Sequence, residues 1–256
     1  MTLNMLIGIL EQGLIYGIMA MGLLITYRIL DFPDLTVDSS FPLGAAVSAT
    51  LTLQGVAPWL TLLIGCAAGG IAGLITGLIH VKCRVRDLLS GIITMTGLYS
   101  INLHIAQNKA NLPLFGGDTL FRNAFTKSLP KAISPYTTLI IIFLIALIAK
   151  ILLDLFLRTK CGYLLRAAGD NPSVVTTLSR DQGMVKILGL IIANALVALA
   201  GAVMCQQQRF FDISMGTGTM VAGLASVEIT AVVFNALTVA DLPHHFQIVI
   251  GALLQP

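Results

Sequence analysis

Charged side chains are scarce in this sequence of 256 residues. They make up 11% of the chain, whereas hydrophobic residues make up 56%. A soluble domain carries about 25% charged residues, so this chain has too few to cover a surface in water. The same composition excludes intrinsic disorder, and a scattered net charge of +3 gives no nucleic-acid-binding surface. The sequence therefore predicts a protein whose surroundings are mostly lipid.

Motifs of metal, hydrolase and nucleotide sites are also missing. No C-x-x-C occurs, and only Cys83 has a nearby histidine, His80, which gives too few ligands for zinc. The cysteines are interpreted as unpaired small hydrophobic residues. The sequence has no H-E-x-x-H, no G-x-S-x-G and no G-x-x-x-x-G-K-[ST]. We therefore expect no metal site, and no ATP bound by this chain through a P-loop.

Long apolar runs fill most of the sequence. A membrane helix needs about 20 mainly apolar residues to cross about 30 Å of hydrocarbon. A final run, Phe246–Leu254, is too short to cross and forms a stub. Residues 1–256 are expected to form one domain, an all-α polytopic transmembrane bundle of about seven spans. The seven spans are Leu3–Tyr27, Leu35–Leu53, Pro58–His80, Leu88–Ala106, Tyr136–Leu157, Ile187–Cys205 and Thr217–Leu237.

Positive charge is distributed unevenly between the connections on the two sides. Cytoplasmic loops of membrane proteins collect Lys and Arg. The short loops on one side hold nine such residues, and those on the other side hold only Arg209. The distribution places the first side in the cytoplasm and the N-terminus outside. The nine residues are Arg28, Lys82, Arg84, Arg86, Arg158, Lys160, Arg166, Arg180 and Lys186.

Glycine recurs at every fourth position of the third span. Small residues at this spacing lie on one helix face and let two backbones approach closely, which drives helix association in lipid. Glycine is also frequent in membrane helices generally, but four in register favour a helix-packing face. The four residues are Gly65, Gly69, Gly73 and Gly77.

The second span begins with an unusual polar segment, RILDFPDLTVDSSFPLGA, at Arg28–Ala45. Pro33 and Pro42 each remove an amide donor, which argues against a continuous helix. One interpretation is a broken second helix that lines a solute path, as in transporters. The alternative is a cytoplasmic loop followed by a short helix that Asp38 or Ser39 caps.

Polar side chains inside spans are expensive and tend to mark pathways. Asn102 lies in the fourth span, and Glu228 lies about midway along the seventh. An asparagine can simply bond a neighbouring helix, whereas a mid-span Glu needs a partner, a proton or a water-lined cavity. Together with Asp38 and Ser39, these residues are our candidates for a translocation path.

The longest inward loop, 158–186, carries the most informative stretch. Leu164, Leu165 and Ala168 can form the apolar face of a short helix whose polar face bears Arg166 and Asp170. A helix lying along the membrane surface suits docking to a cytosolic partner. An ordinary surface connection is the alternative.

Three stretches resemble one family of membrane proteins. They are GYLLRAAGDNP (Gly162–Pro172), LDFPDLTVDSSFPLGA (Leu30–Ala45) and LLSGIITMTGLYSINLHI (Leu88–Ile105). Their sequence and order resemble the membrane subunits of ABC importers in the branched-chain amino-acid and ribose permease family. The second and third stretches are most similar to a bacterial branch linked to amino-acid uptake.

The resemblance implies a type II ABC importer fold and a transport function without enzymatic activity, in the bacterial cell membrane. It implies cytosolic ATPase subunits that carry ATP and Mg, a second permease chain that is either a copy of this one or a close relative, and an extracytoplasmic solute-binding protein. It also implies that the loop helix couples the permease to the ATPase. The coupling residues would be Gly162, Leu165, Arg166, Gly169, Asp170, Asn171 and Pro172.

The sequence departs from the family pattern at two places. Ser39 stands where glycine is expected after Asp38, and family members usually continue through one more complete helix after a stub such as Phe246–Leu254. We therefore expect a different local turn at Ser39, and either a chain that is truncated or altered near its end or the absence of the last helix.

Two other classes of protein compete with the importer. An ion-coupled secondary transporter would use Glu228 as its proton carrier, and an inverted repeat would favour it. An intramembrane enzyme would need a nucleophile and a base inside the spans. Ser100 and Ser226 are available, but no histidine falls well inside a span to activate them.

Overall fold

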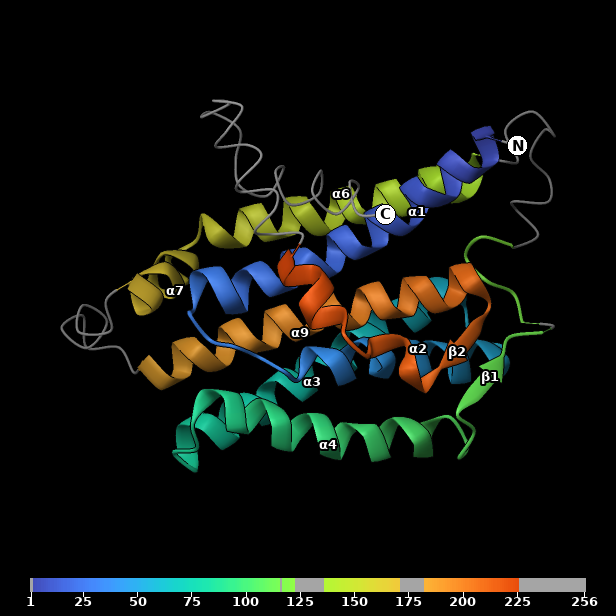
Figure 1. Cartoon of the computed structure of the whole chain (residues 1–256). Coiled ribbons are helices and arrows are strands. Elements are labelled where there is room, and N and C mark those ends of the chain that lie inside the picture. Colours follow the sequence, from blue (N-terminus) through green and yellow to red (C-terminus); the bar gives the residue numbers. More distant parts are fainter. Residues whose placement is uncertain (1, 116, 123–135, 171–181, 226–256) are drawn as a thin grey trace.

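The computed structural model describes residues 2–115, 117–122, 136–170 and 182–225 (Figure 1). Most of the predicted span Thr217–Leu237 and all of the stub Phe246–Leu254 lie outside these residues. Glu228, Asn171 and Pro172 also lie outside them.

The described residues are mostly helical, as predicted, and five of their helices are long and apolar enough to cross a membrane. The five comprise α1 with its π-helical continuation η1, then α3, α4, α6 and α9. In chain order the helices are α1 (Thr2–Leu23), η1 (Leu24–Ile29), α2 (Val37–Leu53), α3 (Pro58–Lys82), α4 (Asp87–Ile105), α6 (Thr137–Leu157), α7 (Lys160–Asp170), α9 (Gln182–Gln208) and the 3-10 helix η2 (Ile213–Gly216).

A small antiparallel sheet adds to the predicted all-helical fold. Strands β1 (Asn111–Pro113) and β2 (Phe210–Asp212) pair with Leu112 opposite Phe211, and both of these side chains are buried. The sheet lies beside the C-terminal end of α9 (Figure 1). A strand of three residues is too short for its alternating pattern to be recognised in an apolar sequence. The sequence therefore did not predict this sheet.

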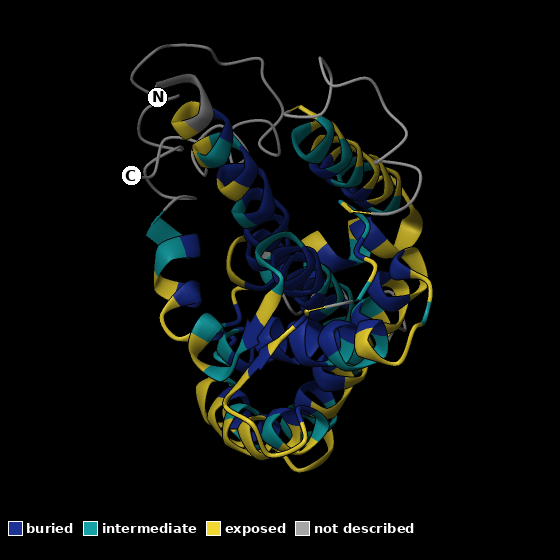
Figure 2. Ribbon diagram, turned by 90° about the vertical axis from the view of Figure 1, so that its right-hand side faces the viewer, coloured by how far each residue is buried: buried dark blue, intermediate teal, exposed yellow. Residues whose placement is uncertain are grey.

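Helix α9 lies at the centre of the bundle. It packs along α3, α2 and α1, and its most extensive contact is with α3. Buried residues concentrate on the central helices, whereas α4 and α6 expose much of their surface (Figure 2). In the apolar stretch of α9, 61% of the residues are buried, whereas in the apolar stretch of α6 only 22% are buried. Helix α6 is therefore peripheral and turns a broad apolar face outward.

Glycines bring the backbones of α2, α3 and α9 into direct contact. A methyl group added at Gly44 would collide with the carbonyl of Ala198, and one added at Gly201 would collide with that of Phe41. All four glycines of the predicted ladder, Gly65, Gly69, Gly73 and Gly77, lie against α9 side chains or backbone. These three helices therefore form a unit in which no side chain separates the backbones at the closest points.

The interruption before α2 differs from the predicted one. The backbone leaves helical geometry only over residues 30–36, where Asp31 has φ 51°, and Pro42 lies inside an unbroken α2. Pro42 cannot donate to the Asp38 carbonyl. Helix α4 supports this turn, because Asn102 Nδ2 donates to the Ser39 carbonyl at 2.9 Å. The expectation that both prolines interrupt the helix was therefore wrong for Pro42.

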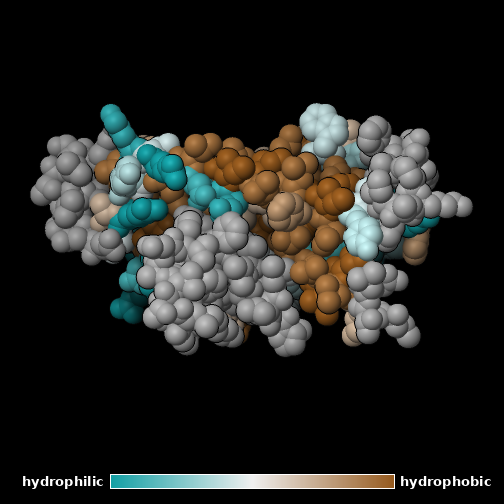
Figure 3. Space-filling view, turned by 90° about the horizontal axis from the view of Figure 1, so that it is seen from above, coloured by the Kyte–Doolittle hydropathy of each residue, from teal (hydrophilic) through white to brown (hydrophobic). Residues whose placement is uncertain are grey.

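The connections predicted to share one side do lie at the same end of the bundle. Helix α7, the start of α9, the α3–α4 turn and the end of η1 gather there, whereas the N-terminus and the β-sheet lie at the opposite end (Figure 1). Seen from above, hydrophilic residues cluster at the α7 end and hydrophobic residues cover the middle (Figure 3). This arrangement is that of a helical bundle whose middle faces lipid.

Glycine 73 gives a direct test of the packing. A Gly73→Ala variant places a methyl group against the Leu190 carbonyl, and we expect overpacking of about 1–3 kcal/mol to lower its thermal midpoint in detergent. Gly97→Ala is the matched control, since nothing lies within 4 Å of a methyl group there. Equal thermal midpoints for the two variants would contradict the backbone contact.

Candidate functional site

Helix α7 forms a short amphipathic element at the end of the bundle. Leu165 and Ala168 are buried, whereas Tyr163 and Arg166 are exposed. The residues just before them, Arg158 and the adjoining Thr159 and Lys160, are exposed as well. The helix thus presents a basic face with one aromatic side chain to its surroundings, and its apolar face to the protein.

Three glycines seat α7 closely on its neighbours. Gly162 lies against the backbone of Leu157 at the end of α6, and Gly169 lies against the carbonyl of Ile29. Gly189 of α9 lies between the side chains of Leu30 and Leu165. At Gly169, no side chain separates the backbone of α7 from the carbonyl of Ile29, the last residue of η1.

The predicted coupling residues therefore occupy different positions. Arg166 is on the exposed face, whereas Leu165, Gly162 and Gly169 hold the helix in place. Asp170 is the last residue of α7. Asn171 and Pro172 lie outside the described residues.

The segment 30–36 follows η1 and is held by a buried polar network. Asp34 is 1% exposed; its Oδ1 accepts the Thr36 backbone N–H at 2.9 Å, and its Oδ2 accepts Asn194 Nδ2 of α9 at 2.8 Å. The other amide atom, Asn194 Oδ1, accepts Ser40 Oγ of α2 at 2.7 Å. Thr36 and Thr76 of α3 share a hydrogen bond at 3.0 Å. Hydrogen bonds within the protein therefore satisfy the polar side chains around this irregular segment.

Three of the four predicted path residues meet around the first turns of α2. Ser39 Oγ donates to the Met95 carbonyl of α4, and Asn102 donates to the Ser39 carbonyl. Asn102 Oδ1 is buried and accepts no hydrogen bond from the described residues. The cluster thus retains one spare polar atom in the interior.

Asp38 caps the short helix that begins at residue 219, not the start of α2 in which it lies. Its Oδ1 accepts the Met220 N–H at 2.8 Å and the Thr219 hydroxyl at 3.0 Å, and its Oδ2 accepts the Gly218 N–H at 3.4 Å. The start of α2 itself carries no side-chain cap, so the expectation that Asp38 or Ser39 caps α2 was wrong. Asp38 instead ties α2 to the chain that follows η2.

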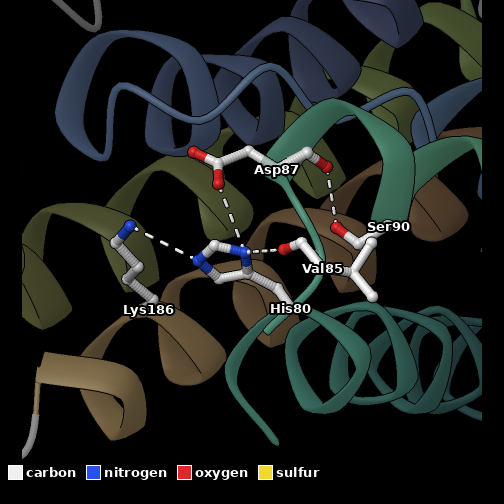
Figure 4. A network of polar contacts seen from close by, with 5 residues as sticks. All are labelled: His80, Val85, Asp87, Ser90 and Lys186. Carbon is white, nitrogen blue, oxygen red and sulfur yellow. Dashed lines mark hydrogen bonds and ion pairs between the residues drawn. The ribbon is translucent and has the colours of Figure 1, made fainter. Parts of the chain in front are cut away.

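A second polar junction lies at the α7 end (Figure 4). His80 Nδ1 donates to the Val85 carbonyl at 2.8 Å and lies 3.2 Å from Asp87, while Lys186 Nζ lies 3.4 Å from Nε2. The ring of Phe32 meets the imidazole edge to face at 5.2 Å. His80 therefore joins α3, the α3–α4 turn, the start of α9 and the segment 30–36.

Sequence reasoning did not assign Gln206, a polar residue that joins distant helices. Gln206 Nε2 donates to Ser48 Oγ, Thr61 Oγ1 and the Pro58 carbonyl, and its Oε1 accepts the Leu120 N–H. The sequence signal was an amide or carboxylate within or beside an apolar run. Gln206 and Ser48 are 158 positions apart, so the pattern alone gives no pairing.

The buried polar atoms hold helices and loops in place. The exposed face of α7 carries cations and an aromatic ring. Within the described ranges, no group of three His, Cys, Asp or Glu side chains is placed to hold a metal ion.

Comparison with known proteins points to one family. Residues 5–254 match the family described as branched-chain amino acid transport system, permease component. The tyrosine transport system permease protein of Clostridioides difficile is 43% identical over 233 residues, which are 91% of this chain and 75% of that one. The ribose import permease protein RbsC of Escherichia coli is 24% identical over 227 residues, 88% and 68% of the two chains. No solved structure matches.

An archaeal protein extends this set of relatives. The probable branched-chain amino acid transport permease protein LivH of Methanocaldococcus jannaschii is 28% identical over 237 residues, 86% of this chain and 75% of that one. Both this relative and the clostridial one are named for amino-acid transport.

The apolar helices and the family match define a multi-pass membrane protein of the transport class, not an enzyme. This chain belongs to the family of branched-chain amino acid transport system permease components. It is a permease component of an ABC importer, a transport system of the bacterial inner membrane.

The hydrogen bond between Asn102 of α4 and the Ser39 carbonyl of α2 provides a test of the polar cluster. An Asn102→Leu variant keeps the side-chain size but removes the donor to the buried Ser39 carbonyl. We expect a loss of about 1–3 kcal/mol in stability, seen as a lower thermal midpoint in detergent. Thr96→Val on the same helix is the control, because Thr96 is exposed and bonds only its own helix. A thermal midpoint of Asn102→Leu equal to that of Thr96→Val would show that the Asn102–Ser39 hydrogen bond does not stabilise the start of α2.

Proposed function

We propose that α7 is the surface on which a cytosolic ATPase docks. The observation that carries this proposal is the division of α7 into a buried face at Leu165 and Ala168 and an exposed face at Tyr163 and Arg166. Membership of an ABC permease family supports it, because such systems are energised by a separate ATPase. Gly162, Gly169 and Leu165 fix the helix, and Arg166, with Asp170, Asn171 and Pro172, contacts the partner.

The complete transporter would contain two permease chains around one path. Two ATPase subunits would dock on the α7 helices from the cytoplasm, and a solute-binding protein would deliver the solute at the opposite end, where the N-terminus lies. Asp38, Ser39, Asn102 and Glu228 would line the path. The spare acceptor of Asn102 and the clustering of three of these residues around α2 support that assignment.

The proposed solute is an amino acid, with tyrosine as the first compound to test. The support is the 43% identity to a permease named for tyrosine transport. Uptake of labelled tyrosine by cells that contain or lack this chain tests the solute. Ribose is the competing solute, since the more distant relatives are named for it.

The docking role of α7 gives a prediction about Arg166. An Arg166→Ala variant removes an exposed cation, and we expect about tenfold less ATPase retained on purification, the effect of losing roughly 1.4 kcal/mol of binding energy. Solute uptake should fall in parallel while the amount of inserted permease stays constant. Lys109→Ala is the matched control, an exposed cation beyond the far end of α4. Normal retention and uptake in Arg166→Ala would show that this residue does not couple the two subunits.

The orientation gives a separate prediction. Cys83 and Cys161 are exposed and belong to the α7 end, whereas Cys205 is buried. In intact cells a membrane-impermeant maleimide should not modify Cys83 or Cys161, and it should modify both once the cytoplasmic face is opened. An added cysteine at Lys109 should react from outside. Modification of Cys83 in intact cells would show that the orientation is the opposite of the predicted one.

A further inference from the structure

Asp34 is a buried carboxyl group with hydrogen bonds but no counter-ion. It is 1% exposed, and within the described part of the chain no Lys, Arg or His lies within ion-pair distance of it. Burying such a group is unfavourable unless it is well bonded. Its two oxygens face different elements, Oδ1 its own segment at Thr36 and Oδ2 helix α9 at Asn194.

The segment 30–36, which contains Asp34, lies near α7 at one end and continues along the chain into α2 at the other. At one end, Gly169 lies against the Ile29 carbonyl, and Leu30 packs on Gly189 beside Leu165. At the other end, Thr36 immediately precedes the first residue of α2. Asp38, the second residue of α2, accepts hydrogen bonds from the backbone N–H groups of Gly218 and Met220.

The surroundings of the segment limit how it can move. Helices α2, α3 and α9 meet backbone to backbone at glycines such as Gly44 and Gly69, and close packing of this kind resists sliding. The segment 30–36 has no helical ladder of its own. Backbone hydrogen bonds from Leu30 and Phe32 to the carbonyls of Ile25 and Thr26 hold its beginning. The Asp34–Asn194 hydrogen bond ties its middle to the central helix α9.

We propose that Asp34 is a positioning residue that transmits displacement of α7 to α2 and, through Asp38, to residues 218–220. This proposal rests on the proposed docking of an ATPase on α7. When α7 shifts, residues 29 and 30 shift with it, and the Asp34–Asn194 hydrogen bond turns that motion into a change at the start of α2. Ser40, which bonds the same Asn194, completes the joint.

Two variants separate the hydrogen bond from the shape of the side chain. Asp34→Asn keeps the shape and an acceptor for Thr36, but its amide nitrogen then faces the Asn194 Nδ2 donor, so the bond to α9 is lost. The exchanged pair Asp34→Asn/Asn194→Asp restores a donor and an acceptor between the two residues in the opposite sense. The exchanged α9 carboxylate still accepts from Ser40, although it no longer donates to the Leu190 carbonyl of its own helix. Asp154→Asn on α6, where the carboxylate pairs with Lys150, is the control for losing a carboxylate elsewhere.

The measurement is hydrogen exchange in the purified permease–ATPase complex, with and without a non-hydrolysable ATP analogue. In the unaltered complex and the Asp154→Asn control, binding of the analogue should change exchange both in α7 and in residues 216–222. In Asp34→Asn the change in α7 should remain, while the change in residues 216–222 falls by at least about fivefold, the lower range of allosteric coupling. The exchanged pair should restore it.

Each other outcome is decisive. A normal response of residues 216–222 in Asp34→Asn, or no restoration in the exchanged pair, overturns the relay. Loss of the α7 response in Asp34→Asn, or failure of both variants to insert in the membrane, makes Asp34 a docking or folding residue and also overturns it. If the unaltered chain retains no ATPase at all, the proposed docking function fails instead, and the relay fails with it.

Discussion

Direct backbone contact between α2, α3 and α9 is the constraint on which the rest of the structure depends. In lipid, apolar side chains gain little by leaving one apolar environment for another, so helices associate through close packing and interhelical hydrogen bonds. Gly44 against Ala198 and Gly201 against Phe41 bring the backbones together. Once the backbones are this close, short polar side chains such as Ser40 and Asn194 reach across between helices.

This central unit explains how a chain with so few charges contains an ordered polar interior. In the described part of the chain, the buried groups are amides, hydroxyls and the carboxyls of Glu11 and Asp34, and most of them bond the backbone or side chain of another element. Gln206 alone joins α9 to α2, to the start of α3 and to Leu120. The peripheral helices α4 and α6 then add apolar surface toward lipid, and α7 lies across the end of the bundle on glycine contacts.

Much of the fold could be predicted from the sequence because lipid imposes simple rules. Runs of about 20 apolar residues marked the crossing helices, and the alternation of apolar and polar residues in the loop 158–186 marked the amphipathic α7. What the pattern could not give was tertiary. Pro42 indicated a break, yet it lies inside an unbroken α2, and the β1–β2 pairing joins segments about a hundred residues apart.

The candidate site divides in the same way. The exposed and buried faces of α7 follow from helical spacing, so Arg166 and Leu165 could be assigned to opposite faces in advance. Asp34 was visible only as one of several acidic residues near two prolines. Its pairing with Asn194 depends on how α9 packs after a further 160 residues of chain. Asp38 likewise looked like a cap for the helix in which it lies, and the fold gives it the start of another.

The central claim is that α7 is where energy from an ATPase enters this permease, and Tyr163 allows the most direct measurement. This side chain is 62% exposed on α7, and replacing it with a photo-crosslinking phenylalanine derivative in native membranes captures whatever lies against the helix. The account predicts one crosslinked product that contains an ABC-type ATPase. The same substitution at Tyr99 on α4, 52% exposed, should give none. No ATPase at Tyr163, or equal capture at both positions, would contradict the account.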